Sequence, residues 1–280
     1  MISLFLILIM IICPACLAEE EKKAEQKIDG FSLVQYDDGG GKKWEMNGRS
    51  AELEGDKVKI DAVSLLSSNN QTFLKLKAKE GEFDKVEKIV YLQNNVVMKS
   101  SDGTMLTTDS LNWDAGTKNV FTEDPVNIKK SDFEVSGKGA QVDLENKIAE
   151  LREDVTANIE SLPSGYSRSG VDPSALSETG DLRTTITCDG PLEINYNKNK
   201  AVFLNNVKIE DIQGNILADR IDVYFNKGTK RIRCVVARGN VKIINGENVT
   251  YSEKAIYLVE EGRVVLPNRP KLVIQNERSE

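Results

Sequence analysis

The feature that most constrains this chain is a segment of alternating apolar and polar residues around a short turn, which occurs four times. In DSLNWDAGTKNVFTEDPVNI (residues 109–128), Leu111 and Trp113 alternate with polar residues, a turn follows, and the alternation resumes. Similar segments are GEFDKVEKIVYLQNNVVM (81–98), GAQVDLENKIAELREDVTANI (139–159) and GPLEINYNKNKAVFLNNVKI (190–209). Period-two alternation is typical of strands with one buried face, so each copy predicts two strands joined by a turn.

The spacing of the copies indicates that they stack. Asp84, Asp114 and Asp143 open the turns of three successive copies at intervals of about 30 residues, and Asn195 opens the turn of the fourth. One strand pair cannot bury its own apolar face, so neighbouring pairs are expected to cover one another. Helical spacing is not sustained anywhere after the N-terminal segment. The predicted fold class is therefore all-β, built from antiparallel strands.

The first residues, MISLFLILIMIICPACLA, predict export. Cleavage after Ala18 would leave Cys16 and Ala18 at the small-residue positions that signal peptidase reads. The apolar run also approaches the length of a membrane span, which allows an uncleaved anchor. A lipid anchor at Cys16 is the third alternative. All three place the rest of the chain outside the cytoplasm.

Two strand-rich modules flank a segment without periodicity. Residues 161–181, SLPSGYSRSGVDPSALSETGD, are rich in Ser, Gly and Pro and predict a linker. In the second module we predict one strand over 185–196 and two separate strands over 231–237 and 240–244. The predicted divisions are a signal peptide or membrane anchor (1–18), a tether (19–30), a first module (31–160), a linker (161–181), a second module (182–276) and a tail (277–280).

Composition argues against several classes of function. The net charge is −7 without a basic block, so nucleic acid is not an expected partner. The chain has no histidine, which removes the commonest general base and the commonest zinc ligand. The carboxylates on predicted strand faces are scattered. We therefore predict a non-enzymatic protein without cofactor or metal.

Both modules resemble components of the bacterial lipopolysaccharide-export bridge. Residues 31–159 resemble LptC in Tyr36-Asp37 with its Gly-rich turn, WEMNGRSA (44–51), LKLKAKE (74–80), YLQNNVVMKSSDGTMLTTDSLNWD (91–114), DPV (124–126) and GKGAQVDL (137–144). Residues 182–274 resemble the LptA/OstA-like module in FLNNVKIEDIQGNILADRIDVYF (203–225), VVARGNVKI (235–243) and RVVLPNRPKLV (263–273). The resemblance is thus to an LptC-like protein fused to an LptA/OstA-like module.

This resemblance implies a fold, a function and partners. The fold would be two open antiparallel β-jellyroll modules of stacked strand repeats. The function would be that of a periplasmic carrier in a Gram-negative bacterium, binding the lipid portion of lipopolysaccharide in an apolar groove during export from the inner to the outer membrane. The partners would be lipopolysaccharide, the inner-membrane export ABC transporter and other bridge proteins, joined head to tail through edge strands. The N-terminal segment would anchor the protein to the inner membrane. The alternative is a structural or adhesive β-solenoid of the envelope with a closed, dry core.

Alternation also predicts which side chains would line the groove, because neighbours in a strand point to opposite faces. The candidates are Leu76, Phe83, Val90, Leu92, Val96, Leu106, Leu111, Trp113, Val126, Ile128 and Val142 in the first module, and Ile194, Tyr196, Phe203, Val207, Ile209, Ile221, Val223, Phe225, Val241 and Ile243 in the second. We expect the modules to stack edge to edge, so that lipid does not meet water between them.

Two cysteines lie beyond the N-terminal segment. Cys188 and Cys234 each share strand parity with apolar neighbours, so both are expected to face inward. An exported protein can form a disulfide between such a pair. Two buried, unpaired thiols would show the same pattern, and both readings stay open at this stage.

Overall fold

The computed structural model describes residues 26–37, 39–68, 73–114, 116–130, 133–160, 183–211, 214–229, 231–267 and 269–273. The predicted signal or anchor segment, the linker and the tail lie outside these residues. The first strand already begins at Gln26, inside the predicted tether. Within the described ranges, no helix has the length and apolar character needed to cross a membrane.

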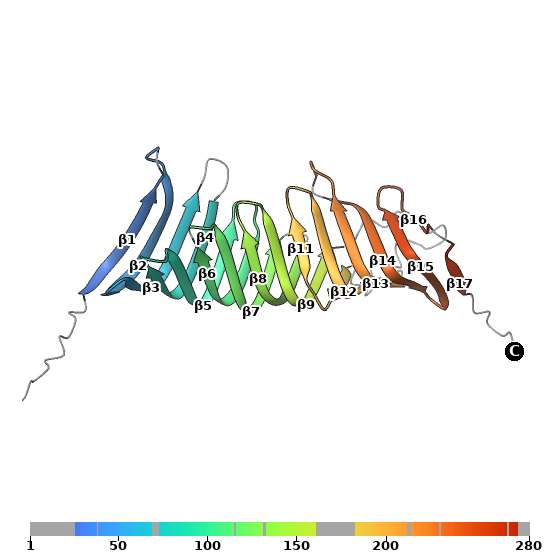
Figure 1. The fold of residues 1–280 in the computed structure, drawn as a ribbon, viewed down its shortest axis with the longest axis horizontal. Coiled ribbons are helices and arrows are strands. Elements are labelled where there is room, and N and C mark those ends of the chain that lie inside the picture. Colours follow the sequence, from blue (N-terminus) through green and yellow to red (C-terminus); the bar gives the residue numbers. More distant parts are fainter. Residues whose placement is uncertain are drawn as a thin grey trace, which may run out of the picture.

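The described residues form one antiparallel sheet of 17 strands, which confirms the all-β prediction. Figure 1 shows the strands side by side in a long array, with β1 at one end and β17 at the other. The strands are β1 (Gln26–Tyr36), β2 (Lys42–Glu54), β3 (Lys57–Ser68), β4 (Phe73–Asp84), β5 (Ile89–Ser100), β6 (Met105–Asp114), β7 (Asn119–Lys130), β8 (Phe133–Asp143), β9 (Ile148–Glu160), β10 (Arg183–Cys188), β11 (Leu192–Asn195), β12 (Lys200–Asp211), β13 (Gly214–Phe225), β14 (Ile232–Asn245), β15 (Asn248–Leu258), β16 (Arg263–Val265) and β17 (Lys271–Val273).

The strands pair largely in chain order, and the pairing continues from one module into the other. From β1 to β9 the order is a simple antiparallel meander. Strand β9 then pairs along one half with β10 and along the other half with β11, and β12 pairs with both. The meander resumes to β15, whose two halves pair with β16 and β17. The expected edge-to-edge stacking of the modules is confirmed.

The repeated turn has a local physical cause. The side chain of Asp84 accepts hydrogen bonds from the backbone N–H groups of Val86 and Glu87, both at 2.9 Å. Asp114 and Asp143 accept equivalent bonds in their own turns. The residues that close these turns adopt the left-handed conformation, with φ of 59° at Lys88, 58° at Lys118 and 56° at Lys147. Asp and Asn stabilise turns through such side-chain bonds, which explains why they open each copy of the repeat.

Many strands change direction near their midpoint. Left-handed residues lie at Asn94 and Asn95 of β5, at Asn205 and Asn206 of β12, and at Asn240 of β14, and the strand register shifts at each of these places. The sequence prediction of two strands over 231–237 and 240–244 was wrong, because this bulge bends one strand without ending it. The prediction of one strand over 185–196 was also wrong, since it consists of β10 and β11.

These bends fold the sheet onto itself. Trp44 is near the start of β2 and Trp113 is near the end of β6, strands that run in the same direction. On a flat sheet the opposite ends of such strands would lie about 35 Å apart. The two indole rings are 5.8 Å apart, so the strand halves on one side of the bends face the strand halves on the other side. These two layers are here called the arms of the sheet. One buried core lies between the arms and extends through both modules.

Candidate functional site

The predicted groove residues, except Tyr196, belong to this core or pack against it. The buried ones are Leu76, Val90, Leu92, Val96, Leu106, Leu111, Trp113, Val126, Phe203, Val207, Ile209, Ile221, Val223 and Val241. The partly buried ones are Phe83, Ile128, Val142, Ile194, Phe225 and Ile243. Strand pleating and burial thus bring together, along one interior, side chains that are far apart in the sequence.

Tyr196 is the exception, and its predicted inward position was wrong. Its exposed fraction is 56%. Strand β11 ends one residue earlier, at Asn195. The backbone N–H of Tyr196 donates to the carbonyl of Lys147 in the neighbouring turn. Alternation no longer determines side-chain direction once the strand has ended.

Sequence reasoning missed part of the interior in β2 and β3. Trp44, Met46 and Leu65 are buried in the same core. The signal was present in β2, because Trp44 and Met46 alternate with polar neighbours. These strands lie outside the four repeats, which explains why a search based on the repeat overlooked them.

An aromatic cluster joins the two arms near the first-module end of the interior. The ring of Trp44 meets that of Phe83 at 6.2 Å and that of Trp113 at 5.8 Å, with interplanar angles of 68° and 75°. Such edge-to-face geometry is the favoured contact between aromatic rings. The Nε1 atom of Trp44 is buried and has no hydrogen-bond partner.

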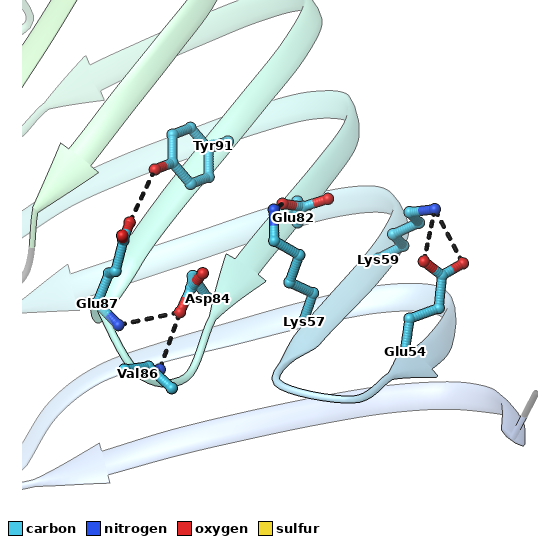
Figure 2. A network of polar contacts seen from close by, with 8 residues as sticks. All are labelled: Glu54, Lys57, Lys59, Glu82, Asp84, Val86, Glu87 and Tyr91. Carbon is cyan, nitrogen blue, oxygen red and sulfur yellow. Dashed lines mark hydrogen bonds and ion pairs between the residues drawn. The ribbon is translucent and has the colours of Figure 1, made fainter. Parts of the chain in front are cut away.

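The opposite face of β2 to β5 is polar. Figure 2 shows Lys57 paired with Glu82 at 2.6 Å and Lys59 with Glu54 at 2.8 Å. Lys57, Lys59 and Glu82 help to line a surface depression of about 500 Å³. The hydrogen bond from Lys57 to Glu82 raises the pKa of the lysine. This face holds solvated ion pairs and is separate from the predicted apolar groove.

A second charged group lies in β12 to β14 and was not predicted. The carboxylate of Asp222 has a side-chain exposure of 2% and contacts Arg220 at 2.9 Å, Arg238 at 3.2 Å and Lys200 at 3.3 Å. Burial raises the pKa of Asp222, but the hydrogen bonds from Arg220 and Lys200 outweigh burial and hold it below its ordinary value. Cationic side chains from three strands thus compensate a buried charge.

The disulfide between Cys188 and Cys234 is not formed. Both side chains are free thiols, Cys188 buried and Cys234 partly buried. They lie on β10 and β14, with β12 and β13 between them in the sheet. Three strand spacings of about 4.8 Å exceed the ~7 Å that a disulfide can bridge between Cα atoms. Burial raises the pKa of the Cys188 thiol, as expected for an unreactive core cysteine.

No metal centre emerges from the described residues, where no group of three or more Asp, Glu, Cys or His side chains is arranged to hold an ion. The carboxylates that the structure describes are instead used in turns and ion pairs, such as those of Asp84 and Glu82. The backbone N–H groups of Glu87 and Val86 hold the pKa of Asp84 below its ordinary value. What the arrangement offers is a long apolar interior with polar outer faces.

Comparison with protein families identifies this architecture. The family described as "Lipopolysaccharide-assembly, LptC-related" matches residues 2–160, more than half of the chain. The chain belongs to the LptC-related family. The family described as "LptA/(LptD N-terminal domain) LPS transport protein" matches residues 186–279. No individually curated protein matches the chain.

Membership of the LptC-related family supplies the general role. Proteins of the LptC and LptA families are non-enzymatic components of the lipopolysaccharide-transport bridge in the cell envelope. In this chain an LptC-related domain is followed by an LptA/LptD-type domain within one polypeptide. The two domains share the single antiparallel sheet described above.

Proposed function

We propose that this LptC-related protein carries the lipid portion of lipopolysaccharide in the interior between the two arms. The observation that carries the proposal is the unbroken interior at the junction of the modules. Leu151 of β9 lies opposite Leu192 of β11, and both are only 1% exposed. Val155 of β9 lies opposite Cys188 of β10, and both are buried. Acyl chains moving along this interior would not cross a polar gap between the modules.

Carriage requires the arms to separate. Leu76 and Val90 are 0% exposed, so protein side chains pack closely in the interior. A lipid would replace these contacts between the arms with contacts to its acyl chains. Both states bury apolar surface from water, so the exchange costs far less than exposing the core would.

The sheet ends suggest how partners join. Strand β1 pairs only with β2 among the described strands, which leaves its other edge free for another chain. At the other end β17 is a short strand whose Val273 lies opposite Val249 of β15. We propose that these edges accept strands from the inner-membrane transporter and from other bridge proteins, head to tail. The location would be the periplasm, with the N-terminal segment as an inner-membrane anchor.

The test is site-specific photocrosslinking in cells that make lipopolysaccharide. A photoreactive phenylalanine analogue at Ile128 or at Phe225 samples the interior of each module. The same analogue at Tyr251 is the control, because this exposed side chain packs beside Lys242 on the opposite face. We expect lipopolysaccharide adducts at both interior positions and none at the control. Adducts at neither interior position would refute carriage and favour a structural solenoid with a dry core.

A further inference from the structure

The indole N–H of Trp44 lies in the packed interior without a hydrogen-bond partner. The side chain is 4% exposed, and its Nε1–H is the one buried polar side-chain group in the described residues without a hydrogen-bond partner. A buried indole N–H usually finds an acceptor, because water is lost on burial and must be replaced. The buried hydroxyls of Thr108 and Thr122 illustrate the rule, since they lie 3.5 Å apart and bond to each other.

The position of Trp44 relates this unpaired donor to the opening of the arms. In the sheet Trp44 lies opposite Gln35 of β1 and Ser67 of β3. Its ring nevertheless contacts Phe83 and Trp113, each one residue before a turn at the far end of its strand. These contacts therefore close the space between one arm and the other. Any molecule that enters between the arms here must separate Trp44 from the facing rings.

The facing rings offer the donor no conventional acceptor atom. Phenylalanine has no acceptor atom, and the indole of Trp113 is a donor only. The other core side chains near the cluster in the sheet, such as Met46 and Leu65, are apolar. A hydrocarbon chain alone would also leave the Trp44 N–H unpaired. An acceptor oxygen carried by a mainly apolar ligand would supply the missing partner.

We propose that Trp44 is a lipid-binding residue whose Nε1–H donates to a carbonyl oxygen at the head of an acyl chain. The ligand class is an acylated glycolipid, with ester or amide carbonyls where its chains meet the polar part. The contact between Trp44 and the rings of Phe83 and Trp113 opens as this ligand enters, and the donor gains its acceptor. This inference rests on the proposed carriage of lipopolysaccharide and adds one defined recognition contact to it.

The test compares Trp44→Phe with Trp113→Phe in the full chain, using lipopolysaccharide as the probe. Both variants keep an aromatic ring and lose one indole N–H, so packing changes are matched. We expect Trp44→Phe to weaken binding about 2- to 10-fold, the effect of one hydrogen bond, and to weaken it more than Trp113→Phe, which alters ring contacts but removes no hydrogen bond to the ligand. The unliganded Trp44→Phe protein should not lose thermal stability through the missing N–H, because that group is unpaired before binding.

Fluorescence gives a second, independent measurement. The chain has only two tryptophans, so Trp113→Phe leaves Trp44 as the sole tryptophan emitter. Added lipopolysaccharide should shift its emission to longer wavelength, as an indole that gains a hydrogen bond does. An unchanged affinity of Trp44→Phe, or equal weakening by both variants, would overturn the role of the N–H. If the wild-type protein does not bind lipopolysaccharide, the proposed carriage is wrong. If the wild type binds and Trp44→Phe binds equally well, only the Trp44 contact is wrong.

Discussion

The junction between the modules makes Gly190 a sensitive position. Gly190 lies between β10 and β11, where both strands meet β9, and its φ is +103°. A Cβ atom there would overlap the carbonyl oxygen of Arg152 and come within 2.8 Å of the carbonyl carbon. Both atoms belong to the β9 backbone, so a side-chain rotation cannot relieve the overlap.

The expected cost of Gly190→Ala follows from these two effects. An alanine held at this φ costs about 1–3 kcal/mol. Displacing a packed strand to admit the extra methyl costs about 1–3 kcal/mol more. The strain falls on the pairs that join β9 to β10 and β11, which among the described strands are the strand pairs that link the first module to the second. We therefore expect Gly190→Ala to uncouple the unfolding of the modules.

Urea unfolding with two probes measures this. Both tryptophans, Trp44 and Trp113, lie in the first module, so their fluorescence follows that module alone. Circular dichroism follows the strands of both modules. Wild type should give coincident transitions, and Gly190→Ala should give a circular dichroism transition that begins at lower urea than the fluorescence transition. The control Gly228→Ala should match wild type, because the nearest atom is 3.6 Å from the new Cβ. Coincident transitions for Gly190→Ala, at the wild-type midpoint, would refute the reasoning.

Three further changes have defined expectations. Asn94→Val should lower the free energy of unfolding by about 1–2 kcal/mol in urea titration, because Asn94 has a φ of 65°, and Asn94→Gly, which tolerates that φ, should not. Leu76→Ala should lower the free energy of unfolding by about 2–5 kcal/mol in the same assay, because Leu76 is fully buried. The control Leu66→Ala, at a side chain that is 40% exposed, should cost less than about 1 kcal/mol, and equal losses would contradict the assigned core. Asp222→Asn should cost about 1–3 kcal/mol at pH 7, since its cationic partners stay partly solvated. The pKa of Asp222 is lowered on folding, so its stabilisation is complete above the unfolded pKa of about 3.9 and is lost as pH falls through the folded value. The difference in free energy of unfolding between wild type and variant should therefore be smaller at pH 3 than at pH 7 in urea titrations, and a constant difference would contradict this.

The sequence by itself determined the buried face of strands such as β6 and β13. Leu111 and Val223 were placed correctly because pleating sends alternate side chains to opposite faces, a property of a few neighbouring residues. The turns that open at Asp84 and Asp143 could also be predicted, because each aspartate side chain accepts hydrogen bonds from backbone N–H groups only two and three positions away.

Only the tertiary structure decided how these strands fold over one another. Alternation cannot tell a bulge from a strand end, so β14 was divided at residues 238–239, although its pairing with β15 continues on both sides. Nor does it show that Trp44 and Trp113 meet, because their contact depends on bends accumulated through the intervening strands. The continuity of the interior at Leu151 and Leu192 depends in the same way on pairing across the predicted linker. Local geometry determines which side chains share a face of a strand. Contacts between arms and between modules depend on the register and bending of many strands together.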